Sequence, residues 1–90
     1  MNLQKIKALL DKGKNIYFER SSIGLSNARH FLYLLKGVAP NIHSSYEDYP
    51  TLYLCKHNGC IILVKSLFPI KKGDILYNNY GKIVKYEDKR

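Results

Sequence analysis

The dipeptide Asn58-Gly59 constrains the fold of this chain more strongly than any other feature of its sequence. It interrupts a β-rich run over residues 51–66, and Asn-Gly between two such runs is the strongest short-range signal for a two-residue hairpin turn. With that turn, His57 faces Cys60 across the hairpin. Strand parity then predicts one face of Tyr53, Cys55, His57, Cys60, Ile62 and Val64, and another of Leu52, Leu54, Lys56, Ile61, Leu63 and Lys65. Because both faces are mostly apolar, we expect this hairpin at the centre of a sheet.

The first forty residues predict two helices with a strand between them. Apolar residues recur at helical spacing over residues 3–12, and Gly13 follows as a stop signal. Residues 15–20 alternate between apolar and polar, as a half-buried strand does. A serine-containing segment at 21–26 offers N-caps for a second helix, which we expect to end at Lys36-Gly37.

A second hairpin is predicted further along the chain. Residues 74–77 and 82–86 have strand-like patterns and flank a four-residue turn at 78–81. The predicted cross-strand pairs are Asp74 with Lys85 and Leu76 with Ile83. With no internal repeat or linker, the sequence predicts a single domain over residues 1–90 of the α+β class, with two helices and a four- to five-stranded, mainly antiparallel sheet.

Charge limits the partners that the chain is suited to bind. Fifteen Lys and Arg residues against seven Asp and Glu give a net charge of +8, and the cations are spread along the chain rather than gathered in a tail. Such a field favours nucleic acid or an acidic or nucleoprotein partner, although lysines also serve simply to keep a surface soluble. The longest uncharged apolar run, residues 60–64, is too short to span a bilayer. We therefore expect a cytoplasmic, intracellular protein, within a host cell if a mobile element encodes it, with no membrane partner.

The cysteines allow three interpretations. Cys55 and Cys60, with His57 between them and His43 upstream, are compatible with a metal site, a cross-hairpin disulfide or two buried thiols. Structural zinc sites use two closely spaced ligand pairs, whereas this chain has a single Cys-x4-Cys, so we expect buried thiols and no metal or other cofactor. For nucleophilic catalysis, His57 can meet Cys60, with Glu47 or Asp48 as a conceivable third member, but a histidine in a turn more often faces solvent, and we assign no catalytic residue.

Tyrosines and lysines interleave in the second half of the chain. Exposed aromatic rings among cations can stack on bases and contact phosphates, and they equally suit protein recognition; the alternative is that the tyrosines pack the core. The candidate binding residues are Tyr46, Tyr49, Lys56, Lys65, Lys71, Lys72, Tyr77, Tyr80, Lys82 and Lys85. Tyr46 and Tyr49 lie in a long polar segment, residues 40–50, that also carries two acidic residues. We therefore expect that segment to contact protein rather than nucleic acid.

Residues 70–81, IKKGDILYNNYG, resemble the closing motif of SET-domain protein lysine methyltransferases, in which an I-x-x-G-E-E-I/L strand leads at the same spacing to Tyr-Gly. Upstream, residues 34–42 resemble the L-L-N-H-S-C-x-P-N segment of the SMYD-like branch of that family. The resemblance implies that Tyr80 matches the tyrosine lining the methyl-transfer channel. Residues 36–39 replace the Asn-His pair that contacts S-adenosylmethionine in the family, so the cofactor-binding motifs are lacking.

Two functional hypotheses follow from the sequence. The first is a non-enzymatic binding module, an accessory protein of a phage or other mobile element, that engages nucleic acid or a nucleoprotein or protein complex through a basic Tyr/Lys surface. The second is a degenerate or partial SET-like protein lysine methyltransferase. Binding of S-adenosylmethionine would discriminate between them.

Overall fold

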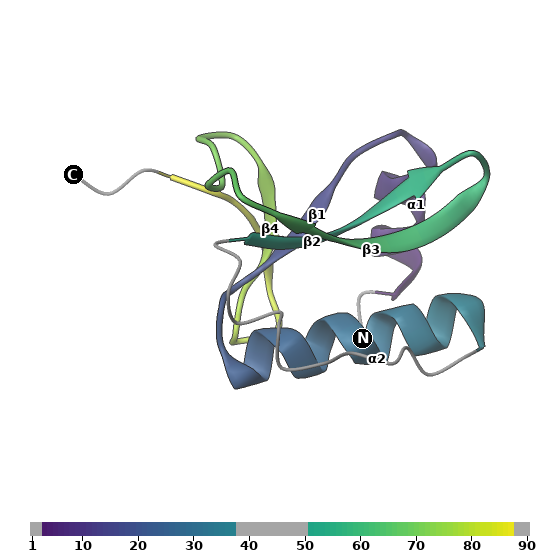
Figure 1. Cartoon of the computed structure of the whole chain (residues 1–90), viewed down its shortest axis with the longest axis horizontal. Helices are drawn as coiled ribbons and strands as arrows, with labels where there is room; N and C mark the ends of the chain where they lie inside the picture. Colours follow the sequence, from purple (N-terminus) through teal and green to yellow (C-terminus); the bar gives the residue numbers. More distant parts are fainter. Residues whose placement is uncertain (1–2, 38–50, 88–90) are drawn as a thin grey trace.

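The computed structural model describes residues 3–37 and 51–87 of the chain. In these residues it contains two helices and one five-stranded, mostly antiparallel sheet, which confirms the predicted α+β class (Figure 1). In chain order the elements are α1 (Leu3–Asp11), β1 (Ile16–Phe18), α2 (Ser22–Lys36), β2 (Thr51–His57), β3 (Cys60–Ser66), β4 (Ile75–Tyr77) and β5 (Ile83–Lys85).

Local capping signals determine the ends of α2. Ser21 has extended backbone angles, and its Oγ accepts a hydrogen bond from the Gly24 N–H at 3.0 Å, so Ser21 is the N-cap among the candidate serines. At the other end, Gly37 adopts a left-handed conformation with φ of 76°, and its N–H donates to the Tyr33 carbonyl at 2.7 Å. This is the glycine C-cap that the sequence predicted.

The strand order corrects one prediction. The sheet runs β3-β2-β1-β4-β5, so β1 is central and the β2–β3 hairpin lies at one edge, not at the centre. β1 pairs antiparallel with β2 and parallel with β4. The apolar pattern on both faces of the hairpin does not place it at the centre, because the two described helices cover the same face of the sheet. Ile62, on the other face, is 36% exposed.

The two hairpins differ in how well their register was predicted. Asn58 and Gly59 form the β2–β3 turn with positive φ values, and His57 pairs with Cys60 as expected. In the β4–β5 hairpin, Tyr77 rather than Leu76 lies opposite Ile83, so the predicted pairs are wrong by one residue.

The physical reason for this shift is the turn between β4 and β5. Asn78 and Lys82 pair through a backbone hydrogen bond of 2.9 Å, which leaves a three-residue turn instead of four and ends in Gly81 at φ of 79°. Because the length of the turn determines the register, every cross-strand pair in the hairpin is shifted by one residue from the predicted one.

The core lies between the helices and one face of the sheet, with α2 running along that face (Figure 1). Its buried members are Ile6, Leu10, Ile16, Phe18, Ala28, Phe31, Leu32, Leu52 and Leu54. By parity, the opposite face of the sheet carries Tyr17, Tyr53, Val64, Leu76 and Val84 in one cross-strand row.

Candidate functional site

The β4–β5 hairpin and the turn that leads into it bring together half of the predicted site residues. We call these five residues the basic hairpin surface: Lys71, Lys72, Tyr80, Lys82 and Lys85. All five are exposed. In the described part of the chain, none of the four lysines forms a salt bridge with a carboxylate. No carboxylate of the described residues therefore neutralises these four charges.

Hydrogen bonds fix the turn that carries Tyr80. The Asn78 Oδ1 accepts from the backbone N–H of Tyr80 at 3.0 Å and from that of Lys82 at 2.9 Å. The Glu19 carboxylate accepts from the N–H of Asn79, which ties the turn to the segment before α2. Tyr80 is thus an 89% exposed ring on a turn that is held at both ends.

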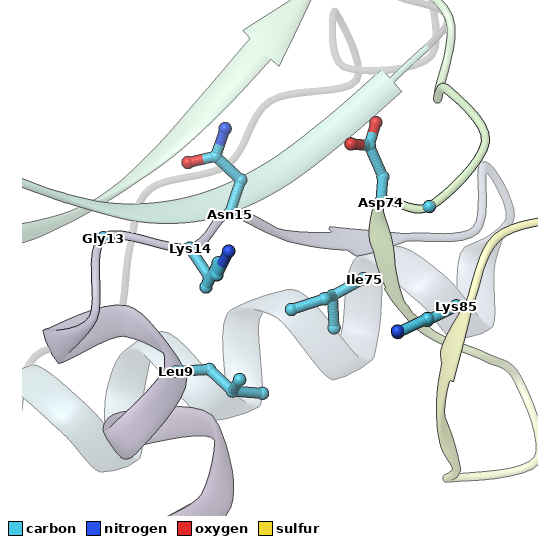
Figure 2. A pocket seen from close by; sticks show the side chains of 8 residues that line it. Leu9, Gly13, Lys14, Asn15, Asp74, Ile75 and Lys85 are labelled. Atoms are coloured by element: carbon cyan, nitrogen blue, oxygen red, sulfur yellow. The ribbon is translucent and has the colours of Figure 1, made fainter.

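A hollow of about 550 Å³ lies between the α1–β1 turn and the β4–β5 hairpin (Figure 2). Its lining comprises Leu9, Gly13, Lys14, Asn15, Gly73, Asp74, Ile75 and Lys85. Lys14 and Lys85, which are 71 positions apart in the sequence, come from opposite sides of it, and Leu9 and Ile75 supply apolar walls (Figure 2). The hollow therefore extends the basic hairpin surface and adds Lys14 to its cations.

Asp74 is the acidic residue in this lining, and its carboxylate is already engaged. Its Oδ2 accepts a hydrogen bond from the Lys71 N–H at 2.8 Å. The register places Lys85 opposite Ile75, so the predicted Asp74–Lys85 pair does not form. Because the two side chains lie on opposite faces of the hairpin, Asp74 does not neutralise Lys85.

Other predicted site residues lie elsewhere. Tyr77 is half-buried in the core, where its ring meets that of Phe31 edge-on at 4.8 Å. Lys56 and Lys65 lie on the β2–β3 hairpin, at the other side of the sheet, and the Lys56 Nζ is 2.8 Å from an Asp11 carboxylate oxygen. Tyr46 and Tyr49 lie outside the described residues.

Sequence reasoning missed two features near the site. One is the position of Lys14 beside the hollow, because no local feature of the sequence links Lys14 to β5. Tyr17 and Tyr53 pack together on the face of the sheet away from the helices, with ring centroids 4.9 Å apart. Burial, and secondarily the nearby Asp74 carboxylate, raises the pKa of Tyr17 above its ordinary value. Strand parity could have predicted that Tyr17 lies on this face, because Tyr17 alternates in the sequence with Ile16 and Phe18, which are buried on the other face.

The two cysteines are free thiols, with Cys55 half-buried and Cys60 exposed. The prediction that both are buried is wrong for Cys60, because it lies next to the turn on an edge strand. Burial raises the pKa of the Cys55 thiol. Across residues 3–37 and 51–87, no three His, Cys, Asp or Glu side chains are grouped so that they could hold a metal ion.

In comparisons with protein families, curated proteins and solved structures, the chain has no match. Neither described helix has the length and apolar character needed to cross a membrane.

Proposed function

We propose that this chain is a non-enzymatic binding module that engages nucleic acid through the basic hairpin surface and the adjoining hollow. In this proposal, lysine ammonium groups contact backbone phosphates, so binding is largely electrostatic and has little dependence on base sequence. We further propose that it acts as an accessory protein of a phage or other mobile element, in which Tyr46 and Tyr49 contact a protein or nucleoprotein partner.

One observation carries this proposal: five lysines from two distant segments lie on one hairpin, on the turn before it or beside the adjoining hollow, none with a carboxylate partner among the described residues. They are Lys14, Lys71, Lys72, Lys82 and Lys85. Separately placed surface lysines would indicate only solubility. Here Lys14 and Lys85 line one hollow from distant parts of the chain, with three more lysines on the adjoining hairpin and turn, and such a local excess of positive charge favours the phosphates of a nucleic-acid backbone.

Salt dependence tests the proposal. If all five lysines contact phosphates, a plot of log affinity against log salt has a slope of about −4.5 on duplex DNA and about −3.5 on a single strand. The double variant Lys82→Gln/Lys85→Gln should weaken binding and make the duplex slope shallower by nearly 2. Fluorescence anisotropy over a series of salt concentrations measures both quantities.

The control is Lys7→Gln/Lys36→Gln, which removes the same net charge from α1 and α2 and should leave the slope unchanged. Equal losses in the two double variants would show that net charge, not this surface, governs binding. Binding that does not respond to salt, or no binding to either form of DNA at low salt, would contradict the proposal.

The alternative proposal is the SET-like methyltransferase, which rests on the motif over residues 70–81. A tyrosine that lines a methyl-transfer channel must be enclosed, whereas Tyr80 is largely exposed in this chain. A calorimetric titration with S-adenosylmethionine separates the two proposals. A dissociation constant in the micromolar range would favour the methyltransferase, whereas the absence of binding heat would favour the binding module.

A further inference from the structure

Two aromatic rings in the described part of the chain project from turns into solvent. Tyr80 is 89% exposed on the β4–β5 turn, and Phe68 is 74% exposed just after β3. Each is close in sequence to cations: Lys82 follows Tyr80 by two positions, and Lys71 follows Phe68 by three. Large rings left in water, close in sequence to lysines that have no carboxylate partner among the described residues, indicate a contact surface rather than a packing role.

The backbone beneath Phe68 is fixed by a buried hydroxyl. Thr51, only 3% exposed, donates its Oγ1 hydroxyl to the Phe68 carbonyl at 2.7 Å, with the Ser66 carbonyl also within reach at 3.2 Å. The Phe68 N–H donates in turn to the Ser66 Oγ at 3.1 Å. The turn under Tyr80 is held equally well by Asn78. Both rings are therefore presented on backbone that is already ordered, which lowers the entropy lost on binding.

From these observations we infer that the ligand is single-stranded nucleic acid in preference to duplex, an inference that rests on the proposed function. Phe68 and Tyr80 stack on unpaired bases while the lysines of the basic hairpin surface contact the phosphates between them. In a duplex, each base face is covered by its neighbours, so the rings have nothing to stack on. The lysines can contact the phosphates of a single strand or of a duplex. The preference for single strands therefore comes from the two rings.

The test compares a fluorescein-labelled oligothymidylate of about 12 nucleotides, within the usual site size of such proteins, with a duplex of the same length. The single strand should bind more tightly at low salt. Phe68→Ala and Tyr80→Ala should each weaken oligothymidylate binding at least about fivefold, because stacking is lost, and should change duplex affinity less than about twofold. Phe68→Tyr and Tyr80→Phe retain a ring and should bind as the wild type does.

Tyr33→Ala is the matched control, since Tyr33 is an exposed tyrosine on α2, away from the basic hairpin surface. It should change neither affinity, and circular dichroism should show that all variants remain folded. A duplex bound as tightly as the single strand, or equal losses on both ligands, would overturn the inference while leaving the proposed function in place. If Phe68→Ala bound oligothymidylate like the wild type, the inference would also fail, and Phe68 would be assigned to a protein contact. If the wild type bound neither ligand, the proposed function itself would fail.

Discussion

Replacing Gly24 by Ala should destabilise the fold, although alanine is the better helix former. Gly24 is buried in the first turn of α2, against the segment that leaves β1. An added Cβ would overlap the carbonyl oxygen of Glu19 and lie 2.8 Å from its carbonyl carbon. These are backbone atoms, so a side-chain rotation cannot relieve the clash, and either α2 or the β1–α2 connection must shift.

The expected cost follows from two opposing effects. Overpacking a close contact costs typically about 1–3 kcal/mol, and a clash with rigid backbone belongs at the upper end. Replacing glycine by alanine in a helix returns about 1 kcal/mol. The net loss in the free energy of unfolding is then about 2 kcal/mol, which lowers the melting temperature of a domain of this size by roughly 8–16 °C.

Thermal unfolding followed by circular dichroism measures this loss, with Ser26→Ala as the control. Ser26 is exposed on the same helix, and its replacement should change the melting temperature by less than about 4 °C. The shift at Gly24 should also reach the site, because the Glu19 carboxylate holds the turn beneath Tyr80. A Gly24→Ala variant as stable as the wild type would refute the reasoning, since it would mean that α2 and Glu19 are not in close contact.

Three further predictions concern other parts of the molecule. The hydrogen bond from Lys56 holds the pKa of Asp11 below its ordinary value, so this ion pair is intact above the ordinary pKa and is lost as the pH falls through the lowered one. In the Lys56→Ala variant, the Asp11 pKa measured by NMR titration should return towards its ordinary value. An unchanged pKa would contradict the assigned ion pair. Replacing Thr51 by Val should cost about 1–2 kcal/mol and speed amide exchange just after β3, because its hydroxyl donates to that segment; unchanged exchange there would argue against the anchoring role. Iodoacetamide should alkylate the exposed Cys60 before Cys55, whose raised thiol pKa leaves less thiolate, and peptide mass spectrometry would reveal the reverse order if this is wrong.

The sequence alone determined the features that depend on neighbouring residues. Asn58-Gly59 predicts the β2–β3 turn and its register, because only certain residues readily adopt positive φ at both turn positions. The serines at positions 21, 22 and 26 predict the start of α2, and Gly37 predicts its end, for similarly local reasons; the structure selects Ser21 among the three. The excess of lysine is likewise a property of the composition. It predicts an anionic partner.

The tertiary structure decided how these pieces combine. The sequence does not say that β1 pairs with β2 and β4 at once, because strand pairing depends on contacts between distant segments rather than on local patterns. The same long-range pairing brings Lys14 to Lys85 around the hollow. It also buries part of Tyr77 in the core while leaving Tyr80, three residues later, in water. Spacing along the chain could not separate these two tyrosines, because the register of one hairpin and the packing of one helix determine which ring reaches solvent.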